Sequence, residues 1–290
     1  MNRFSFDENH REPHPMAMMI RNAPFALLAI AFAAAVRRFR LTVCLLVALF
    51  FQAAPAQALV DQTWISAEGM DSGGCLALVP CATLAYAIRQ TSPGGTIFVM
   101  DSGFYGAATI DRSLTIRSEY GQMSMVASIT VNAASTDKVM LDNVALECAA
   151  PARGIAYGYG VQVLKGADVL LNRVSIKDCL ATGTVGAGVY IYSTTNSRVT
   201  IHDSVIFNNR VGVLVSSTDG MAHAKIYRTL FLSNSESGVR VIGTGNDAIM
   251  ADNNLLGSVK SMDLQSGGAS RSFGNNSMTS GDTPIPMSQY

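Results

Sequence analysis

Apolar positions recur along the chain with the spacing of a repeat built from short strands. Five ten-residue segments align without gaps, and their starts lie 30, 30, 25 and 24 residues apart (Val139, Val169, Val199, Ala224, Ala248). Apolar residues recur at the third position (Leu141, Leu171, Ile201, Ile226, Met250) and again at the eighth (Leu146, Ile176, Ile206, Phe231, Leu255). The segments are too short and too rich in β-branched residues for helices, so we expect strands that bury these positions.

A second motif, Gly-Val-x-apolar, lies between these segments. It occurs at residues 160–163, 188–191, 212–215 and 238–241. Each repeat therefore carries short strands separated by Gly, Asn, Ser and Asp, which favour turns. A single repeat cannot bury its own apolar face, so the pattern predicts a solenoid of stacked coils. Asn209 and Asn234 share one repeat position, and we expect their side chains to bond along the stack.

The N-terminal end of the repeat region is less regular. Residues 94–99, 108–110 and 113–116 indicate an opening coil. Ahead of it, Leu84, Ala87 and Ile88 are spaced as on one face of a short amphipathic helix, which we expect to cap the open end of the core. The predicted organisation is a strand and capping helix at 59–92, the solenoid at 93–275 and a C-terminal tail at 276–290.

The first 58 residues carry the pattern of a signal peptide. A positive cluster at 37–40 precedes an uncharged apolar run at 41–51, and 55–58 (PAQA) offers an A-x-A cleavage site. We therefore expect export, a mature chain that begins near Leu59, and a secreted or periplasmic location. The long region before the cluster fits either a later start codon or a membrane hairpin. We favour the later start, because neither apolar run reaches the ~20 residues that span a bilayer.

Several short motifs resemble a known family. They are an opening strand at 63–66 (TWIS), PCATL at 80–84 followed by Ala87-Ile88, GGTI at 94–97 and SLTI at 113–116. With them the chain resembles the right-handed parallel β-helix family, also called pectin-lyase-like, and within it an exported bacterial subgroup of unassigned function. The resemblance covers roughly residues 62–275. It implies an all-β, right-handed parallel β-helix solenoid, but no particular chemistry, because one fold hosts many functions.

Four cysteines remain after the signal peptide, and their even number in an exported chain favours disulfides over buried free thiols. Cys75 and Cys81 lie just before the expected helix, where a bridge would close a small loop. Cys148 and Cys179 are 31 residues apart where the repeat is 30, which places them on adjacent coils. We predict both pairs.

Composition argues against two classes of partner. The chain has 21 basic and 21 acidic residues, but the part after residue 58 carries a net charge of −3 and has no basic patch. Nucleic-acid binding therefore lacks its electrostatic contribution. No further long apolar run predicts a membrane span after signal cleavage. We expect a monomer without cofactor or bound metal.

The chemistry expected of the family's enzymes, mostly polysaccharide lyases and glycoside hydrolases, has no clear signature. A calcium-dependent lyase needs clustered carboxylates, but the column formed by Asp142, Asn172, His202 and Tyr227 holds one. The next column (Asn143, Arg173, Asp203, Arg228, Asp252) alternates in charge from its second member, which predicts a ladder of surface ion pairs. A hydrolase needs two carboxylates about 5–9.5 Å apart, and no Asp-Asp pair supplies them.

One outward-facing surface suggests ligand binding. Val189 and Ile191 should point inward, so Tyr190 and Tyr192 should point outward, with Gln162 and Arg240 in the Tyr190 column. Exposed aromatic rings beside polar groups can stack on sugars, although exposed Tyr is also ordinary on a β surface. The hypothesis favoured by the sequence is an exported, non-catalytic β-helix that binds carbohydrate or a cell-envelope component. The alternatives are a polysaccharide lyase or glycoside hydrolase of this fold, and a structural or adhesin-like surface protein.

Overall fold

The computed structural model describes residues 36–37, 59–181 and 185–287, and the fold lies in the unit from Gln57 to Tyr290. The predicted signal peptide at 1–58 lies outside the described residues except for Val36 and Arg37, so it stays a prediction. Among the described residues, no helix is both long and apolar enough to cross a membrane.

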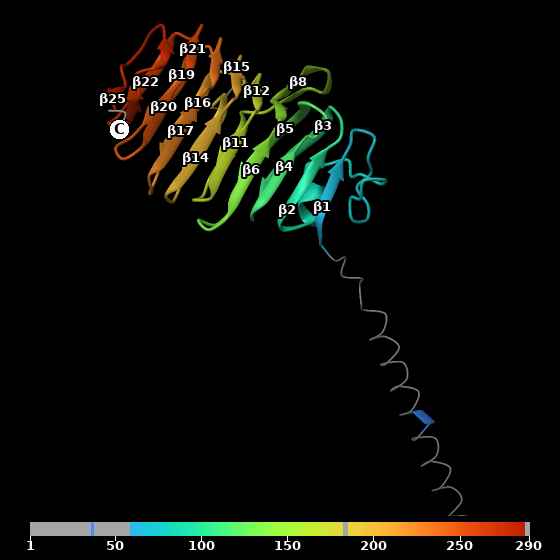
Figure 1. Cartoon of the computed structure of the whole chain (residues 1–290). Helices are drawn as coiled ribbons and strands as arrows, with labels where there is room; N and C mark the ends of the chain where they lie inside the picture. The colour runs from blue at the N-terminus through green and yellow to red at the C-terminus, as the bar shows by residue number, and fades with distance from the viewer. Residues whose placement is uncertain (1–35, 38–58, 182–184, 288–290) are drawn as a thin grey trace, which may run out of the picture. The chain divides into compact units, whose positions relative to one another are not determined.

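The strands of the two large sheets stack in parallel, each beside its equivalents in the coils before and after (Figure 1). The first sheet contains ten of them: β1 (Val60–Ile65), β2 (Thr91–Val99), β4 (Leu114–Arg117), β6 (Lys138–Asp142), β11 (Asp168–Asn172), β14 (Ser197–His202), β17 (Ala222–Tyr227), β20 (Asp247–Ala251), β23 (Ala269–Ser272) and β25 (Ile285–Pro286). Other strands, or a helix between β1 and β2, separate these neighbours in sequence, so each belongs to a different coil.

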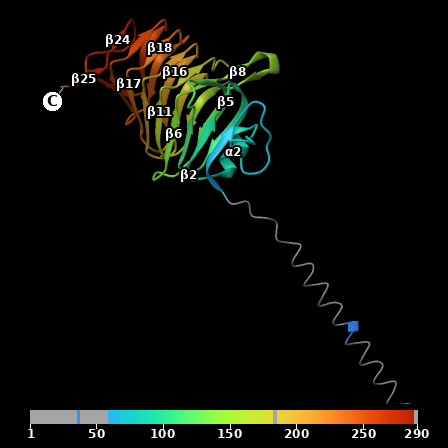
Figure 2. The ribbon, with the colours of Figure 1, turned by 45° about the vertical axis from the view of Figure 1, so that its right-hand side comes forward.

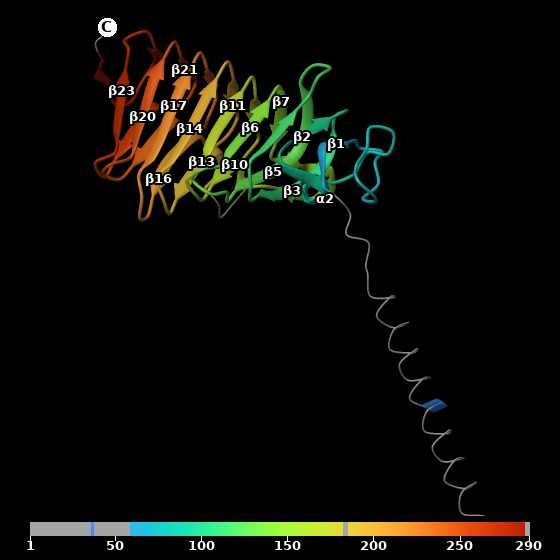
Figure 3. The same cartoon turned by 60° about the horizontal axis from the view of Figure 1, so that its bottom comes forward.

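A second sheet supplies the other two faces of each coil. One arm holds β22 (Lys260–Gln265), β19 (Ser237–Ile242), β16 (Val211–Ser217), β13 (Ala187–Ser193) and β10 (Tyr159–Val163); the other holds β7 (Val144–Glu147), β12 (Ser175–Lys177), β15 (Val205–Phe207), β18 (Leu230–Leu232), β21 (Asn254–Leu256) and β24 (Ser277–Met278). The long strand β5 (Met123–Val131) pairs with β10, with β7 and with β3 (Gly103–Ile110), and so joins the arms. Three strand faces thus surround one core (Figure 3).

The two predicted apolar columns form this core. Leu171 pairs with Leu141 and Ile201, and Ile226 continues the column to Met250. The eighth-position residues pair in the same way, from Leu146 to Leu255. All ten side chains have at most 1% of their surface exposed. The alternation of inward and outward residues predicted from sequence is therefore confirmed.

The glycine of the Gly-Val motif lies where two faces of the coil meet. A Cβ on Gly188 would come 2.8 Å from Cγ2 of Ile206 and 2.9 Å from the carbonyl oxygen of Gly212 in the next coil. Real Cβ atoms do not approach other atoms so closely. The repeated glycine is therefore required by close packing between coils, not by a positive φ angle.

The residues that sequence analysis placed in a charge ladder are corner residues instead. Each links a strand of the first sheet to a strand of the second and has a left-handed φ between 46° and 58° (Asn143, Arg173, Asp203, Arg228, Asp252). One predicted rung forms, with Arg228 Nε 2.7 Å from Asp203 Oδ1. Arg173 instead pairs with Asp142, at 2.7 Å. Asp252, the next member of the ladder, acts to raise the pKa of Arg228 through its charge. The predicted ladder is therefore present in part, around Arg228, while Arg173 pairs with the neighbouring column.

Asparagine side chains bond along the stack at two corners. The predicted pair forms, since Asn209 Nδ2 donates to Asn234 Oδ1 at 3.1 Å, and both residues are buried. A second pair was not predicted: Asn253 Nδ2 donates to Asn276 Oδ1 at 2.8 Å. Asn209 and Asn253 also donate to main-chain carbonyl groups, so the amides satisfy polar groups that the corners would otherwise bury unpaired.

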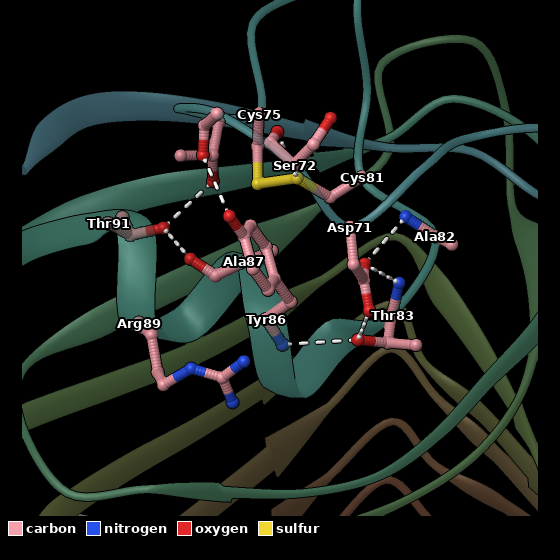
Figure 4. Close-up of a disulfide and its surroundings, with 12 residues drawn as sticks. Asp71, Ser72, Cys75, Cys81, Ala82, Thr83, Tyr86, Ala87, Arg89 and Thr91 are labelled. Carbon is pink, nitrogen blue, oxygen red and sulfur yellow. Dashed lines mark hydrogen bonds between the residues drawn. A yellow bond between two sulfur atoms is a disulfide. The ribbon is translucent and has the colours of Figure 1, made fainter. Parts of the chain in front are cut away.

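The predicted helix is α2 (Leu84–Gln90), which lies against the first coil (Figure 2). The Thr83 hydroxyl accepts from the Tyr86 amide at 3.2 Å, and such an N-cap satisfies a donor that the first helical turn leaves free (Figure 4). Leu84, Ala87 and Ile88 are buried in the core. The predicted apolar face is thus present, while the capping role assigned to the helix stays a prediction.

Both predicted disulfides are present, with Cα atoms 4.9 Å apart for Cys75–Cys81 and 4.8 Å apart for Cys148–Cys179. Two successive coils have a long corner between the arms of the second sheet, at residues 148–158 and 178–186. The second bridge joins these two corners, because each contains one of its cysteines. The first of these corners contains β8 (Ala149–Ala150), a 3₁₀ turn at Pro151–Arg153 and β9 (Ile155–Ala156). The equivalent corners of the following coils are short. At the other end of the chain, the segment expected as a tail includes β24 and β25, which extend both sheets.

Candidate functional site

The four residues predicted to bind a ligand come from three strands of one face. Tyr190 and Tyr192 lie on β13, and register places Gln162, Tyr190, Leu214 and Arg240 side by side on successive coils. All four predicted residues are partly exposed, and they alternate with fully buried neighbours such as Val189 and Ile191, so they lie on the outer side of their strands. The column predicted from sequence is thus correct, although alignment alone does not show whether these side chains are available to a ligand.

Tyr190 packs mainly against its own protein. It lies on a small apolar cluster outside the main core, formed by Ala187, Val211 and Leu214. The Tyr190 and Tyr192 rings have their centroids 5.3 Å apart with 31° between their planes. Burial, with a smaller effect of Tyr192, raises the pKa of Tyr190 to about 12, so its hydroxyl stays a donor at neutral pH. Tyr192 is not part of this apolar cluster.

Arg240 is held in an ion network. Its Nε lies 2.7 Å from Asp263 Oδ2 and its Nη1 3.0 Å from Glu236 Oε2. Lys260 Nζ also approaches Asp263, at 2.7 Å. Burial acts to raise the pKa of Asp263, but the bonds from Lys260 and Arg240 outweigh it and hold this pKa below its ordinary value. Of the four predicted residues, Gln162 and Tyr192 therefore remain the best placed to meet a ligand.

A depression of about 450 Å³ lies on the outer face of the first sheet. It lies over β4, β6, β11 and β14, which are neighbouring strands (Figure 1). Met140 and Leu170, both half-buried, are neighbours in register and form an apolar shelf. Besides Val139 and Val169, whose side chains are buried, the other residues that line it are hydroxyl-bearing or charged (Thr115, Thr200, Lys138, Asp168, Arg198). Asp168 Oδ1 lies 3.0 Å from Arg198 Nη1. Sequence analysis missed this site, because its residues approach only when the coils are in register.

A histidine–aspartate pair lies beside this depression. His223 is the register neighbour of Arg198, and its Nδ1 bonds the carboxylate of the buried Asp247. Arg271 Nη2 holds the other oxygen of that carboxylate at 3.0 Å. The spacing of the two residues in the sequence is the one signal that could have predicted the pair. They are 24 residues apart, which is the length of one coil here, so parallel stacking places them side by side.

A second such pair is at the other end of β14, where His202 Nδ1 lies 2.9 Å from Asp203 Oδ2. Arg228 also bonds both oxygens of this carboxylate, and its hydrogen bonds, followed by that of His202, keep the pKa of Asp203 well below its usual range. Within residues 36–37, 59–181 and 185–287, no group of three or more His, Cys, Asp or Glu residues could hold a metal ion.

Comparison with known proteins bears on the fold. Residues 158–256 match the family model described as right handed beta helix region. The fold is a right-handed parallel β-helix. A search of curated proteins found no match. The matched residues include Tyr190, Tyr192 and the part of the depression on β11 and β14, whereas its part on β4 and β6 lies outside the match.

Proposed function

We propose that the protein is an exported β-helix that binds carbohydrate through the depression on its first sheet and does not cleave it. The observation that carries this proposal is the combination of an apolar shelf, Met140 and Leu170, with surrounding hydroxyl and charged groups. Ligand sites are typically apolar surfaces with a few polar groups that fix orientation. A sugar ring has complementary chemistry, with an apolar C–H face and hydroxyl groups around its edge.

The groups at the depression support binding better than cleavage. Glycoside hydrolysis ordinarily needs two carboxylates that flank the scissile bond. Asp168 is the one carboxylate lining the depression, and it forms an ion pair with Arg198. Thr115 and Thr200, on the strands at either side, offer neutral hydroxyl groups to a bound sugar.

Tyr192 and Gln162 form a second candidate surface for the same activity. They lie on the first arm of the second sheet, whereas the depression lies on the first sheet. One short oligosaccharide would occupy one face or the other. We assign binding to the depression, because Tyr190 and Arg240 on the second surface are already engaged by neighbouring residues of the chain.

Two disulfides in the structure are typical of an oxidising, extracytoplasmic environment. Together with the pattern at residues 37–58, they support the proposal that the protein is secreted or periplasmic and acts there as a monomer. A cell-envelope or extracellular polysaccharide is then the proposed partner.

The test is a glycan array followed by calorimetry on the glycans that bind. Leu170→Asp should weaken binding at least tenfold, about 1.4 kcal/mol, by placing a charge on the shelf. Ile249→Asp is the matched control, because Ile249 is also half-buried in an outward position of this sheet but does not line the depression. Loss of binding with Tyr192→Ala and not with Leu170→Asp would move the site to the second surface.

Assays for unsaturated products and new reducing ends, run on the same glycans, test the non-catalytic part of the proposal. We expect no product. Product formation abolished by His223→Ala would show instead that the His223–Asp247 pair is catalytic.

A further inference from the structure

The first strand of the solenoid has its outer edge covered by a short disulfide-closed segment. We name residues 75–81 the edge segment. The Trp64 amide donates to the Cys75 carbonyl at 2.8 Å, and the Cys81 amide donates to the Trp64 carbonyl at 2.9 Å. The Ser66 amide donates to the Cys81 carbonyl at 3.0 Å. Main-chain groups of β1 that face away from β2 are thus paired within the chain.

The edge segment is held by its main-chain bonds to β1, by the bond from the Met70 amide to the Pro80 carbonyl at 3.0 Å and by the bridge, rather than by side-chain packing. Leu76, Leu78 and Val79 have 55%, 96% and 52% of their surface exposed, so they add little packing. Both cysteines are fully buried, and the bond between them fixes the two points at which the segment contacts β1 (Figure 4). Loss of this bond would free a closed loop of seven residues, which makes opening of the segment roughly fiftyfold easier.

An uncovered strand edge is a template for pairing with another chain. At the opposite end of the same sheet, β25 consists of Ile285 and Pro286, and proline has no amide hydrogen to donate. The β1 edge, six residues long, is therefore the better site for pairing. Two β1 strands pairing antiparallel about a two-fold axis would form a closed dimer.

We propose that the Cys75–Cys81 disulfide is a redox-controlled lock on the β1 edge, and that its reduction allows a second copy of this chain to pair with β1. A dithiol reductant supplies two electrons and two protons: the S–S bond breaks, two thiols form, and the reductant becomes a disulfide. The lock is independent of the carbohydrate site, which lies on β4 to β14.

The test compares two double variants of the full exported protein by size-exclusion chromatography with light scattering over a range of concentrations. Cys75→Ser/Cys81→Ser should form a dimer, and Cys148→Ser/Cys179→Ser should remain a monomer while oxidised. Hydrogen exchange at the Trp64 amide should be roughly fiftyfold faster in the first variant under dilute, monomeric conditions. Adding a dithiol to the second variant reduces its Cys75–Cys81 bond and should produce the same dimer. This measurement tests the proposal even if the first variant does not fold.

Gln62→Pro in the first variant tests the pairing itself. Gln62 is exposed and lies two residues before Trp64 on a regular stretch of β1. Its main-chain N–H therefore points to the same edge of β1 as that of Trp64, away from β2. Removing this donor should restore the monomer. A first variant that stays monomeric at all concentrations with unchanged Trp64 exchange would overturn the proposal, as would larger assemblies that Gln62→Pro leaves intact.

Discussion

Replacing Gly188 by alanine tests whether the Gly-Val motif is set by contact between coils. The added methyl group would lie 2.8 Å from Cγ2 of Ile206, 2.9 Å from the Gly212 carbonyl oxygen and 3.0 Å from Asn209 Nδ2. Ile206 is fully buried, and the Asn209 amide is bonded to Asn234, so neither neighbour moves freely. The carbonyl oxygen belongs to the paired strand β16, and relief there would shift the next coil.

Overpacking of this kind costs about 1–3 kcal/mol, and three simultaneous close contacts place Gly188→Ala at the upper end. A loss of about 3 kcal/mol corresponds to a fall in Tm of roughly 6–12 °C for a domain of this size. Urea denaturation followed by circular dichroism gives the free energy, and calorimetry gives Tm.

Gly74→Ala is the matched control. Gly74 has no atom within 4 Å of an added Cβ and no positive φ, so the same chemical change should leave the free energy of unfolding unchanged or raise it by about 0.4–1 kcal/mol. If the Tm of Gly188→Ala falls no further than that of Gly74→Ala, the explanation of the glycine column by close packing is refuted.

Three further changes probe the core, the ion network and the second bridge. Ile201→Asp should abolish folding, since Ile201 is fully buried and a lone buried carboxylate costs several kcal/mol. His202→Ala, its control on the outer face, should change stability by no more than about 0.5 kcal/mol. Equal shifts of the two variants in thermal scans would contradict the inward and outward assignments. Asp263→Asn should cost about 2 kcal/mol at pH 7. Because the folded pKa of Asp263 is lowered, that difference should shrink as pH falls below the unfolded value of about 4, which urea titrations at several pH values would show. Cys148→Ser/Cys179→Ser should lower the free energy of unfolding by roughly 3–4 kcal/mol in denaturant titrations.

The core could be predicted because its signal repeats. Leu171, Ile201 and Ile226 are each apolar at one position of the repeat, and parallel stacking then places them in contact without further information. Corner geometry was not predictable in this way. Arg173 and Arg228 occupy one column and share a left-handed backbone, yet Arg228 bonds the aspartate of its own column and Arg173 the aspartate of the neighbouring one. Repeat position alone therefore does not predict which partner a long side chain takes.

The candidate sites were less predictable, since they depend on which side chains are already occupied. The outward direction of Arg240 followed from alternation, but its bonds to Asp263 and Glu236 depend on the next coil and on a corner four residues earlier. Met140 and Leu170 look unremarkable in sequence, because apolar residues in outward positions of a β surface are common. Only the surrounding charged and hydroxyl groups, contributed by four different strands, turn them into the floor of a depression.

The unequal corners after β7, β12, β15, β18 and β21 have a consequence for how such a chain can change. The strands on either side of the corners at 148–158 and 178–186 keep register with strands joined by far shorter corners. Additional residues there therefore displace no strand. Val259, 75% exposed at the equivalent short corner between β21 and β22, marks a position where a foreign peptide could be grafted onto a rigid support. Natural lengthening at this corner would give the lineage new surface loops while the stacked columns stay as they are.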